Sequence, residues 1–210
     1  MAAISIVKAA MTISLNYWRK YMDNIYILHG CCDKEEFFSD EYQSMSNSHW
    51  IPWLQKQLVM KGYNVQTPEM PFPYKANYED WKSIFQSFPL NKETTLVGHS
   101  CGCGFFLKYL SETQQPIKRL VLVAPWLDPD KILGEFLTCK LNPKLSELID
   151  HIHVFYAQNE DVTGVKPTVD LVMKSYPKAK LHKFETHGHF CLGDMGTPAF
   201  PELLEVVEHG

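Results

Sequence analysis

The sequence predicts an α/β fold, a three-layer α/β/α sandwich built on a mostly parallel, six-stranded sheet. From residue 24 onward, short apolar runs alternate with segments of helical pattern. Several of the runs are apolar throughout, as strands are when helices cover both faces of a parallel sheet. The chain has 210 residues, of which 45% are hydrophobic and 21% charged, so it is long enough for one domain with a large core.

Six segments are predicted strands because β-branched and aromatic residues are concentrated in them. In order they are NIYILH (24–29), YNVQ (63–66), TTLVGH (94–99), RLVLVA (119–124), IHVFYA (152–157) and KLHKF (180–184). The helices are predicted between them, near residues 49–61, 78–87, 102–114, 131–150, 167–176 and 201–208. On the first of these helices, Trp50 and Trp53 share a face with Leu54 and Leu58, which indicates core residues.

One domain is expected over residues 24–210, because no repeat, low-complexity tract or linker divides it. Residues 1–23 are expected to be an N-terminal extension, either an extra helix or an over-long start. They are apolar enough to suggest a signal peptide, but no basic region precedes the apolar run and Lys8 interrupts it. No stretch reaches about 18 consecutive apolar residues, so no transmembrane helix or membrane partner is predicted.

Charge and cysteine content limit the partners. The 20 Lys and Arg residues are scattered among 24 Asp and Glu residues, so no basic stripe is available for nucleic acid. The cysteines are Cys31, Cys32, Cys101, Cys103, Cys139 and Cys191. They lack the repeated C-x-x-C spacing of structural zinc sites, and so long a chain needs no disulfides. We therefore expect reduced thiols, a cytoplasmic location and no metal, although a redox or metal site built from Cys31, Cys32, Cys101, Cys103 and Cys191 stays open.

The segment Gly98-His99-Ser100-Cys101-Gly102 lies between a predicted strand and a predicted helix. G-x-S-x-G in this position is typical of a nucleophile elbow, a strained turn with no room for side chains beside the serine. Such a turn lifts the serine oxygen clear of the sheet and aims the first backbone N–H groups of the helix at a bound group. Ser100 is therefore the candidate nucleophile.

A serine hydroxyl needs a base to remove its proton and an acid to hold that base in the right tautomer. Asp161 and His189 each follow a predicted strand, at the edge where a parallel sheet binds ligands. The order Ser100, Asp161, His189 is that of α/β-hydrolases. Glu160 stays open as an alternative to Asp161, and His187 as an alternative to His189.

Segments spread along most of the chain match one known family. They are ILHG (27–30), HWIPWLQKQLVMKGYNV (49–65), PEMPFP (68–73), LVGHSCG (96–102), LVLVAP (120–125), NED (159–161), LHKFETHGHF (181–190) and PELLEVV (201–207). From Asn24 to Val207 the sequence thus resembles the small α/β-hydrolase-fold serine hydrolases of the retinoblastoma-binding-protein-nine type. This resemblance implies a hydrolase fold with a minimal cap and hydrolysis of ester or amide bonds without a cofactor.

Position by position, the resemblance implies Ser100 as nucleophile, Asp161 as acid and His189 as base. It also implies oxyanion donors at the backbone N–H groups of Cys101 and Cys31. Two loops depart from the family pattern. The loop after the first strand, residues 30–48, has no glycine after its first residue, and the acid loop NEDVTGVKP has no proline soon after the aspartate. The acid could therefore come from Glu160 or, failing both, from Asp128 after LVLVAPWL.

Four aromatic residues near these loops are candidate substrate-binding residues: Phe72, Tyr74, Trp126 and Phe190. Trp126 is favoured because it follows the strand that delivers the chain to the catalytic edge. His29 and His99 flank glycines at strand ends, and we expect them to help shape the site rather than to catalyse.

The sequence therefore predicts a serine hydrolase, carboxylesterase-like or amidase-like, that acts on a small-molecule ester, thioester or amide through an acyl-enzyme intermediate. The alternative is a catalytically weak hydrolase-fold protein that serves as a protein-binding module. A complete Ser, Asp and His set argues against that alternative, and no feature indicates a protein partner.

Overall fold

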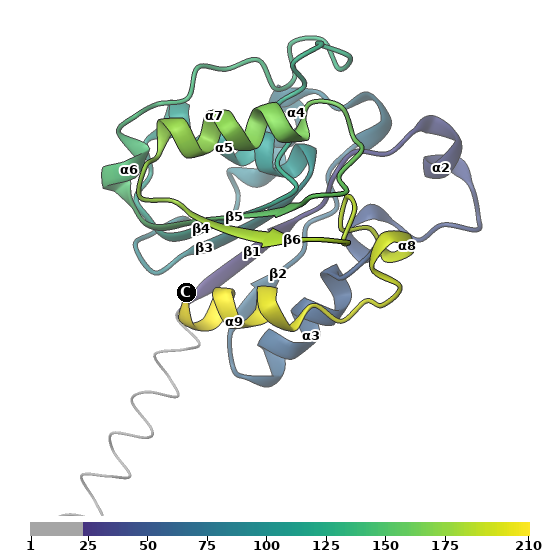
Figure 1. The fold of residues 1–210 in the computed structure, drawn as a ribbon, viewed down its shortest axis with the longest axis horizontal. Coiled ribbons are helices and arrows are strands. Elements are labelled where there is room, and N and C mark those ends of the chain that lie inside the picture. Colours follow the sequence, from purple (N-terminus) through teal and green to yellow (C-terminus); the bar gives the residue numbers. More distant parts are fainter. Residues whose placement is uncertain (1–22) are drawn as a thin grey trace, which may run out of the picture.

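Six parallel strands form the central sheet of the computed structural model, which describes residues 23–210 (Figure 1). They are β1 (Asn24–Leu28), β2 (Asn64–Gln66), β3 (Thr95–His99), β4 (Ile117–Val123), β5 (Ile149–Ala157) and β6 (Lys180–Phe184). Their order across the sheet is β2-β1-β3-β4-β5-β6, and every neighbouring pair is parallel. All six predicted strands are confirmed, whereas the expected N-terminal extension lies, except for Asp23, outside the described residues.

Helices cover both faces of the sheet (Figure 1). On one face lie α3 (Ile51–Met60) and α9 (Pro201–His209); on the other lie α4 (Tyr78–Phe85), α5 (Cys101–Thr113) and α7 (Val165–Ser175). The three layers are those predicted. Over the carboxyl ends of the strands, the described chain places short elements, among them α2 (Lys34–Phe38), α8 (Leu192–Met195) and the 3-10 helices Met45–Asn47 and Pro73–Lys75.

The predicted helix over 131–150 is wrong for most of its length. Only α6 (Leu145–Leu148) is helical there, and β5 begins at the next residue. Gly134 has a φ of +61°, which a right-handed helix does not allow. The Lys108 ammonium also donates hydrogen bonds to the carbonyl oxygens of Glu135 (3.0 Å) and Phe136 (3.1 Å). These hydrogen bonds from Lys108 on α5 hold the segment as a series of turns on the surface of the molecule.

Two glycines let α5 begin directly against the sheet. A Cβ atom on Gly98 would lie 2.8 Å from the backbone nitrogen of Cys103, and one on Gly102 would lie 2.4 Å from the carbonyl oxygen of His29. Neither position can carry a side chain without displacing backbone. The close approach brings the start of α5 to the carboxyl ends of β1 and β3, where the candidate nucleophile lies.

Candidate active site

Ser100 occupies the sharp turn between β3 and α5. Its φ of 53° and ψ of −122° place it in a backbone region that L-residues rarely adopt. The turn is held because Ser100 donates its N–H to the carbonyl oxygen of Val123 (2.9 Å) and its own carbonyl oxygen accepts from the N–H of Trp126 (3.3 Å). A Cβ atom on Gly30 would lie 3.0 Å from the Ser100 Cβ, so the loop after β1 also touches the turn. The geometry is that of the predicted nucleophile elbow.

The structure brings His189, and not His187, to this serine. His189 Nε2 lies 2.9 Å from Ser100 Oγ, and the His189 side chain is 14% exposed. The ring of His187 packs instead against the ring of Phe184, with centroids 4.5 Å apart, and its buried Nδ1 has no hydrogen-bond partner. Of the two histidines that follow β6, only His189 can exchange a proton with Ser100 directly.

The carboxylate beside the imidazole belongs to Glu160. Its Oε2 and Oε1 lie 3.0 and 3.1 Å from His189 Nδ1, and its side chain is 1% exposed. Asp161 is exposed, so the prediction that it contacts His189 is wrong. The reason is the turn that follows β5, closed by the Glu160 N–H on the Ala157 carbonyl (3.3 Å). That turn aims residue 160 inward and residue 161 at solvent, and the Val162 N–H donates to Glu160 Oε1 (2.9 Å).

Three hydrogen bonds to backbone atoms of Gly188 and His189 hold the loop that carries the imidazole. The His189 N–H donates to Asp194 Oδ2 (2.9 Å), and the Gly188 N–H donates to Asn159 Oδ1 (2.9 Å). The third contact joins His99 Nε2 to the carbonyl oxygen of His189 (2.8 Å). Because a carbonyl only accepts, His99 Nε2 carries the proton and donates. Burial holds the pKa of His99 well below its usual value, so the ring is neutral in this role.

The other acid and histidines that the sequence singled out have partners elsewhere. The Asp128 carboxylate accepts hydrogen bonds from the N–H groups of Ile132 (2.8 Å) and Leu133 (2.6 Å), which leaves it serving a turn. His29 Nε2 accepts the N–H of Met70 (2.9 Å), and its Nδ1 donates to the carbonyl oxygen of Gly30 (2.7 Å). As expected of them, His29 and His99 hold loops at the site and do not contact Ser100 through hydrogen bonds.

Cys31 and Cys101, expected as free thiols, are joined by a disulfide with their Cα atoms 5.9 Å apart. The expectation of reduced thiols is therefore wrong for this pair, because the fold brings together two residues 70 positions apart in sequence. Cys32, Cys103, Cys139 and Cys191 are free. Within residues 23–210, no group of three or more His, Cys, Asp or Glu residues is arranged to hold a metal ion, and no helix is long and apolar enough to span a membrane.

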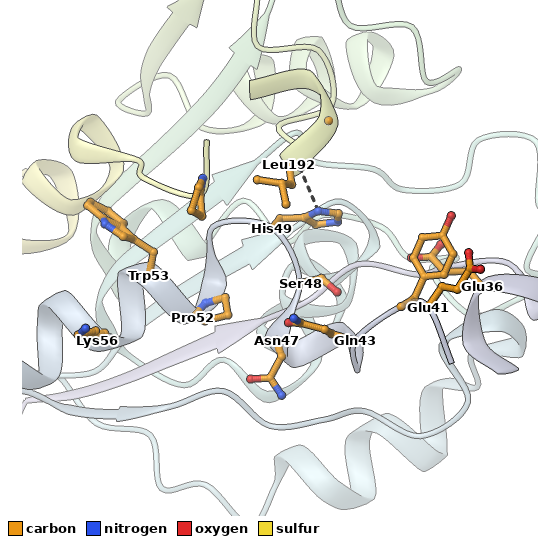
Figure 2. Close-up of a pocket in the computed structure, with 13 residues that line it drawn as sticks. Glu36, Glu41, Gln43, Asn47, Ser48, His49, Pro52, Trp53, Lys56 and Leu192 are labelled. Carbon is orange, nitrogen blue, oxygen red and sulfur yellow. Dashed lines mark hydrogen bonds between the residues drawn. The ribbon is translucent and has the colours of Figure 1, made fainter. Parts of the chain in front are cut away.

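A cavity of about 640 Å³ lies beside the site (Figure 2). Figure 2 shows Glu36 and Glu41 at one end, Trp53 and Lys56 at the other, and His49 between them. His49 links the cavity to the catalytic groups. Its Nδ1 accepts the N–H of Leu192 (3.2 Å), and its ring centroid is 5.4 Å from that of His99, which in turn lies 5.2 Å from His189. Burial and then the nearby His189 lower the pKa of His49, so its ring is neutral.

Sequence reasoning missed this cavity. Its walls come from residues 36–56 and 192–198, where the family segment that begins at His49 was interpreted as a core helix and not as a wall of the site. Only the long loop after the first strand signalled a departure there. Trp53, predicted as a core residue, is partly exposed and lines the cavity, whereas its neighbour Trp50 is buried as predicted.

None of the four predicted substrate-binding aromatics lines this cavity. Phe190 is fully buried and stacks on Phe200, with centroids 5.5 Å apart, so its prediction as a pocket residue is wrong. Phe72 is 49% exposed, and Tyr74 packs against Phe37 (4.8 Å between centroids). Trp126 lies against the elbow through its backbone N–H and donates its indole N–H to the carbonyl oxygen of Thr163 (2.8 Å).

The family model described as serine hydrolase matches residues 40–208, most of the chain. The chain belongs to the serine hydrolase family. A relative of this serine hydrolase, "Putative hydrolase YdeN" of Bacillus subtilis (strain 168), is 28% identical over 191 residues, which are 87% of this chain and 93% of the relative. The solved structures extend this likeness.

The crystal structure of the ydeN gene product from B. subtilis superposes on this serine hydrolase with a TM-score of 0.73 and 26% identity, over 89% of this chain and 97% of that one. The structure of carboxylesterase CesB (YbfK) from B. subtilis has a TM-score of 0.55 at 13% identity, over 89% of this chain and 84% of that one. The second likeness shows the shared fold. This serine hydrolase therefore has an α/β-hydrolase-like sandwich with esterases among its structural neighbours.

Proposed function

We propose that this serine hydrolase cleaves an ester, thioester or amide bond through an acyl-enzyme intermediate, with Ser100 as nucleophile, His189 as base and Glu160 as the orienting acid. One observation carries the proposal. A continuous chain of hydrogen bonds runs from Glu160 through His189 to Ser100 at the strained elbow. Glu160 Oε2 lies 3.0 Å from His189 Nδ1, and His189 Nε2 lies 2.9 Å from Ser100 Oγ. The order in the sequence and the geometry both match the requirements for nucleophilic acyl transfer.

In the acylation half, His189 Nε2 takes the hydroxyl proton as Ser100 Oγ attacks the substrate carbonyl carbon. Glu160 keeps the other ring proton on Nδ1 and stabilises the imidazolium that forms. The carbonyl oxygen becomes an oxyanion, which accepts hydrogen bonds from the backbone N–H groups of Cys101 and Cys31. The imidazolium then protonates the leaving group as its bond to the carbonyl carbon breaks.

In the deacylation half, His189 removes a proton from water, and the resulting hydroxide oxygen attacks the acyl carbon. The second tetrahedral intermediate collapses when the bond to Ser100 Oγ breaks and Nε2 returns its proton to that oxygen. The product is a carboxylic acid, and the enzyme is regenerated without a cofactor. We also propose the narrower assignment to the retinoblastoma-binding-protein-nine type, which rests on the segments quoted from the sequence.

A fluorophosphonate probe tests the proposal, because it reacts covalently with an activated serine. We expect one probe per chain, mapped by peptide mass spectrometry to the peptide that contains Ser100, and turnover of short p-nitrophenyl esters by the same preparation. A protein that folds but neither labels nor turns over any ester or aminoacyl amide would be a binding module instead.

We propose further that the 640 Å³ cavity holds the larger substituent of the substrate. Gly193 on α8 lines it, and a Cβ atom there would meet no heavy atom within 4 Å. A larger side chain can therefore begin at this position without a clash at its Cβ atom, and a tryptophan there narrows the cavity. We expect Gly193→Trp to raise KM for p-nitrophenyl octanoate about tenfold while leaving the acetate ester within about twofold.

Gly193→Ala is the matched control, since one methyl group leaves the cavity open, and its kinetics should be those of the wild type for both esters. Equal losses on acetate and octanoate in the tryptophan variant would mean that the cavity is not the substrate site. Melting temperatures of the two variants, compared by circular dichroism, show whether either change disturbs the fold.

A further inference from the structure

The disulfide joins the two residues that flank the reacting groups. Cys101 directly follows Ser100 in the turn, and Cys31 directly follows Gly30, whose Cα faces the Ser100 Cβ. In the proposed mechanism, on which this inference rests, the backbone N–H groups of the same two residues bind the oxyanion. Within residues 23–210 neither of these N–H groups donates a hydrogen bond to the protein, so both are available to a ligand.

The backbone N–H groups of Cys101 and Cys31 are held in place by different parts of the structure. Cys101 is fully buried and is the first residue of the 13-residue helix α5, so its N–H is held by a rigid element. Cys31 is partly exposed, and residues 29–33 belong to no helix or strand. No backbone hydrogen bond of Cys31 or Cys32 ties this part of the described chain to its surroundings. The peptide group that carries the Cys31 N–H is held on its Gly30 side, where His29 Nδ1 donates to the Gly30 carbonyl oxygen (2.7 Å). The link to Cys101 is the restraint on its Cys31 side.

The remaining thiols are poorly suited to open this link. Burial, followed by the charges of Glu36 and Asp33, raises the pKa of Cys32 to about 11. Burial, followed by the charge of Asp194, raises the pKa of Cys191 to about 12. Thiol–disulfide exchange needs a thiolate, and these two groups are thiols at neutral pH. The bond therefore responds to thiols from outside the chain rather than to its own neighbours.

We propose that the Cys31–Cys101 disulfide positions the Cys31 N–H in the oxyanion hole, so that the oxidised hydrolase turns over substrate faster than the reduced form. The side chain of Cys31 acts as a positioning group, while the group that touches the substrate is its backbone N–H. A loosely held donor loses part of its contribution to the transition state, and removing such a donor altogether costs on the order of 10² to 10³ in kcat. We expect about a tenfold loss on reduction.

The reduction needs an external dithiol, here dithiothreitol. Its thiolate attacks Sγ of the partly exposed Cys31, the Sγ–Sγ bond breaks and the Cys101 sulfur leaves and takes up a proton. The second thiol of the reagent then displaces Cys31 and closes the reagent's own disulfide. Two electrons and two protons pass to the protein, which ends with two thiols.

Steady-state kinetics on p-nitrophenyl acetate test the proposal in wild type, Cys31→Ser and Cys32→Ser, each before and after dithiothreitol and after reoxidation with oxidised glutathione. Cys31→Ser removes the cross-link but keeps the backbone donor, and Cys32→Ser removes the adjacent free thiol as the matched control. We expect reduction to lower wild-type kcat about tenfold with KM within about twofold, and reoxidation to restore it. The kcat of Cys31→Ser should equal that of the reduced wild type and should not change when the reductant is added. The kcat of Cys32→Ser should fall on reduction and recover on reoxidation, as in the wild type.

Peptide mapping without reduction must show the Cys31–Cys101 cross-link in the active protein; its absence even after glutathione treatment would overturn the proposal. So would unchanged kcat in a sample whose mass shows both thiols free, or in Cys31→Ser. If the cross-link serves stability alone, its loss would lower the melting temperature and leave kcat at 25 °C unchanged, which would also overturn the proposal. Failure of the proposed function looks different, because then the oxidised wild type neither labels with fluorophosphonate nor hydrolyses the ester.

Discussion

We expect Ser100→Ala to abolish fluorophosphonate labelling and to lower kcat for p-nitrophenyl esters by about 10⁵-fold to 10⁶-fold, as loss of the nucleophile does in serine hydrolases with a full triad. The oxygen that is removed is the one 2.9 Å from His189 Nε2, and no other group at the elbow offers an activated hydroxyl. Labelling is measured by gel fluorescence and intact mass, and turnover at saturating substrate.

The fold should survive this change. The Ser100 hydroxyl has its hydrogen bond with His189, and the backbone bonds that hold the turn do not involve the side chain. Alanine also keeps a Cβ atom at φ 53°, so the strain at this position stays as it is. Ser87→Ala, which removes an exposed hydroxyl on the Ile84 carbonyl, is the control and should label fully. Stoichiometric labelling of Ser100→Ala would assign the nucleophile to another residue.

The strands and the elbow could be predicted because each depends on neighbouring residues. A run such as RLVLVA is a strand for local reasons, and glycines beside Ser100 indicate a tight turn wherever the chain goes next. The segment 131–150 does not behave in this local way. Its pattern is helical, but Lys108 from a distant helix holds the carbonyl groups of Glu135 and Phe136.

The disulfide and the cavity could not be read from the sequence for a related reason. Cys31 and Cys101 are 70 residues apart, and only the packing of α5 against the end of β1 brings them together. Composition argued that a chain of this size needs no cross-link for stability, which is a statement about the whole core. It says nothing about one loop beside the nucleophile, where the restraint is local.

The choice between two adjacent carboxylates depends on a still finer detail, the path of one turn. The sequence leaves Asp161 and Glu160 one residue apart after the same strand, and a turn that ends one residue earlier exchanges their orientations. The structure closes that turn at Glu160, with the Val162 N–H donating to its Oε1. The Glu160 side chain therefore points inward and reaches His189 Nδ1, whereas Asp161 points to solvent.

We expect Glu160→Gln to lower kcat on the order of 10⁴-fold with KM little changed, the loss seen when the acid of a triad becomes an amide. The reason lies in which end of the amide faces the imidazole. The Val162 N–H requires an acceptor where Oε1 now lies, so the amide oxygen takes that place and the NH₂ group takes the place of Oε2, 3.0 Å from His189 Nδ1. The NH₂ group cannot accept the Nδ1 proton, and the amide oxygen, 3.1 Å from Nδ1 in the place of Oε1, is only a neutral acceptor. The tautomer with its proton on Nε2, which cannot remove the Ser100 proton, therefore gains population, and the imidazolium loses the negative charge beside it.

Asp161→Asn is the matched control for this prediction, because it makes the same chemical change one residue along, on an exposed side chain. Its kcat should stay within about twofold of the wild type, and circular dichroism should show both variants folded. Near-normal turnover in Glu160→Gln with collapse in Asp161→Asn would mean that the turn after β5 takes the other path in solution. Slow fluorophosphonate labelling of Glu160→Gln separates a wrong tautomer from a lost site, since the serine is still present and its labelling rate should fall along with kcat.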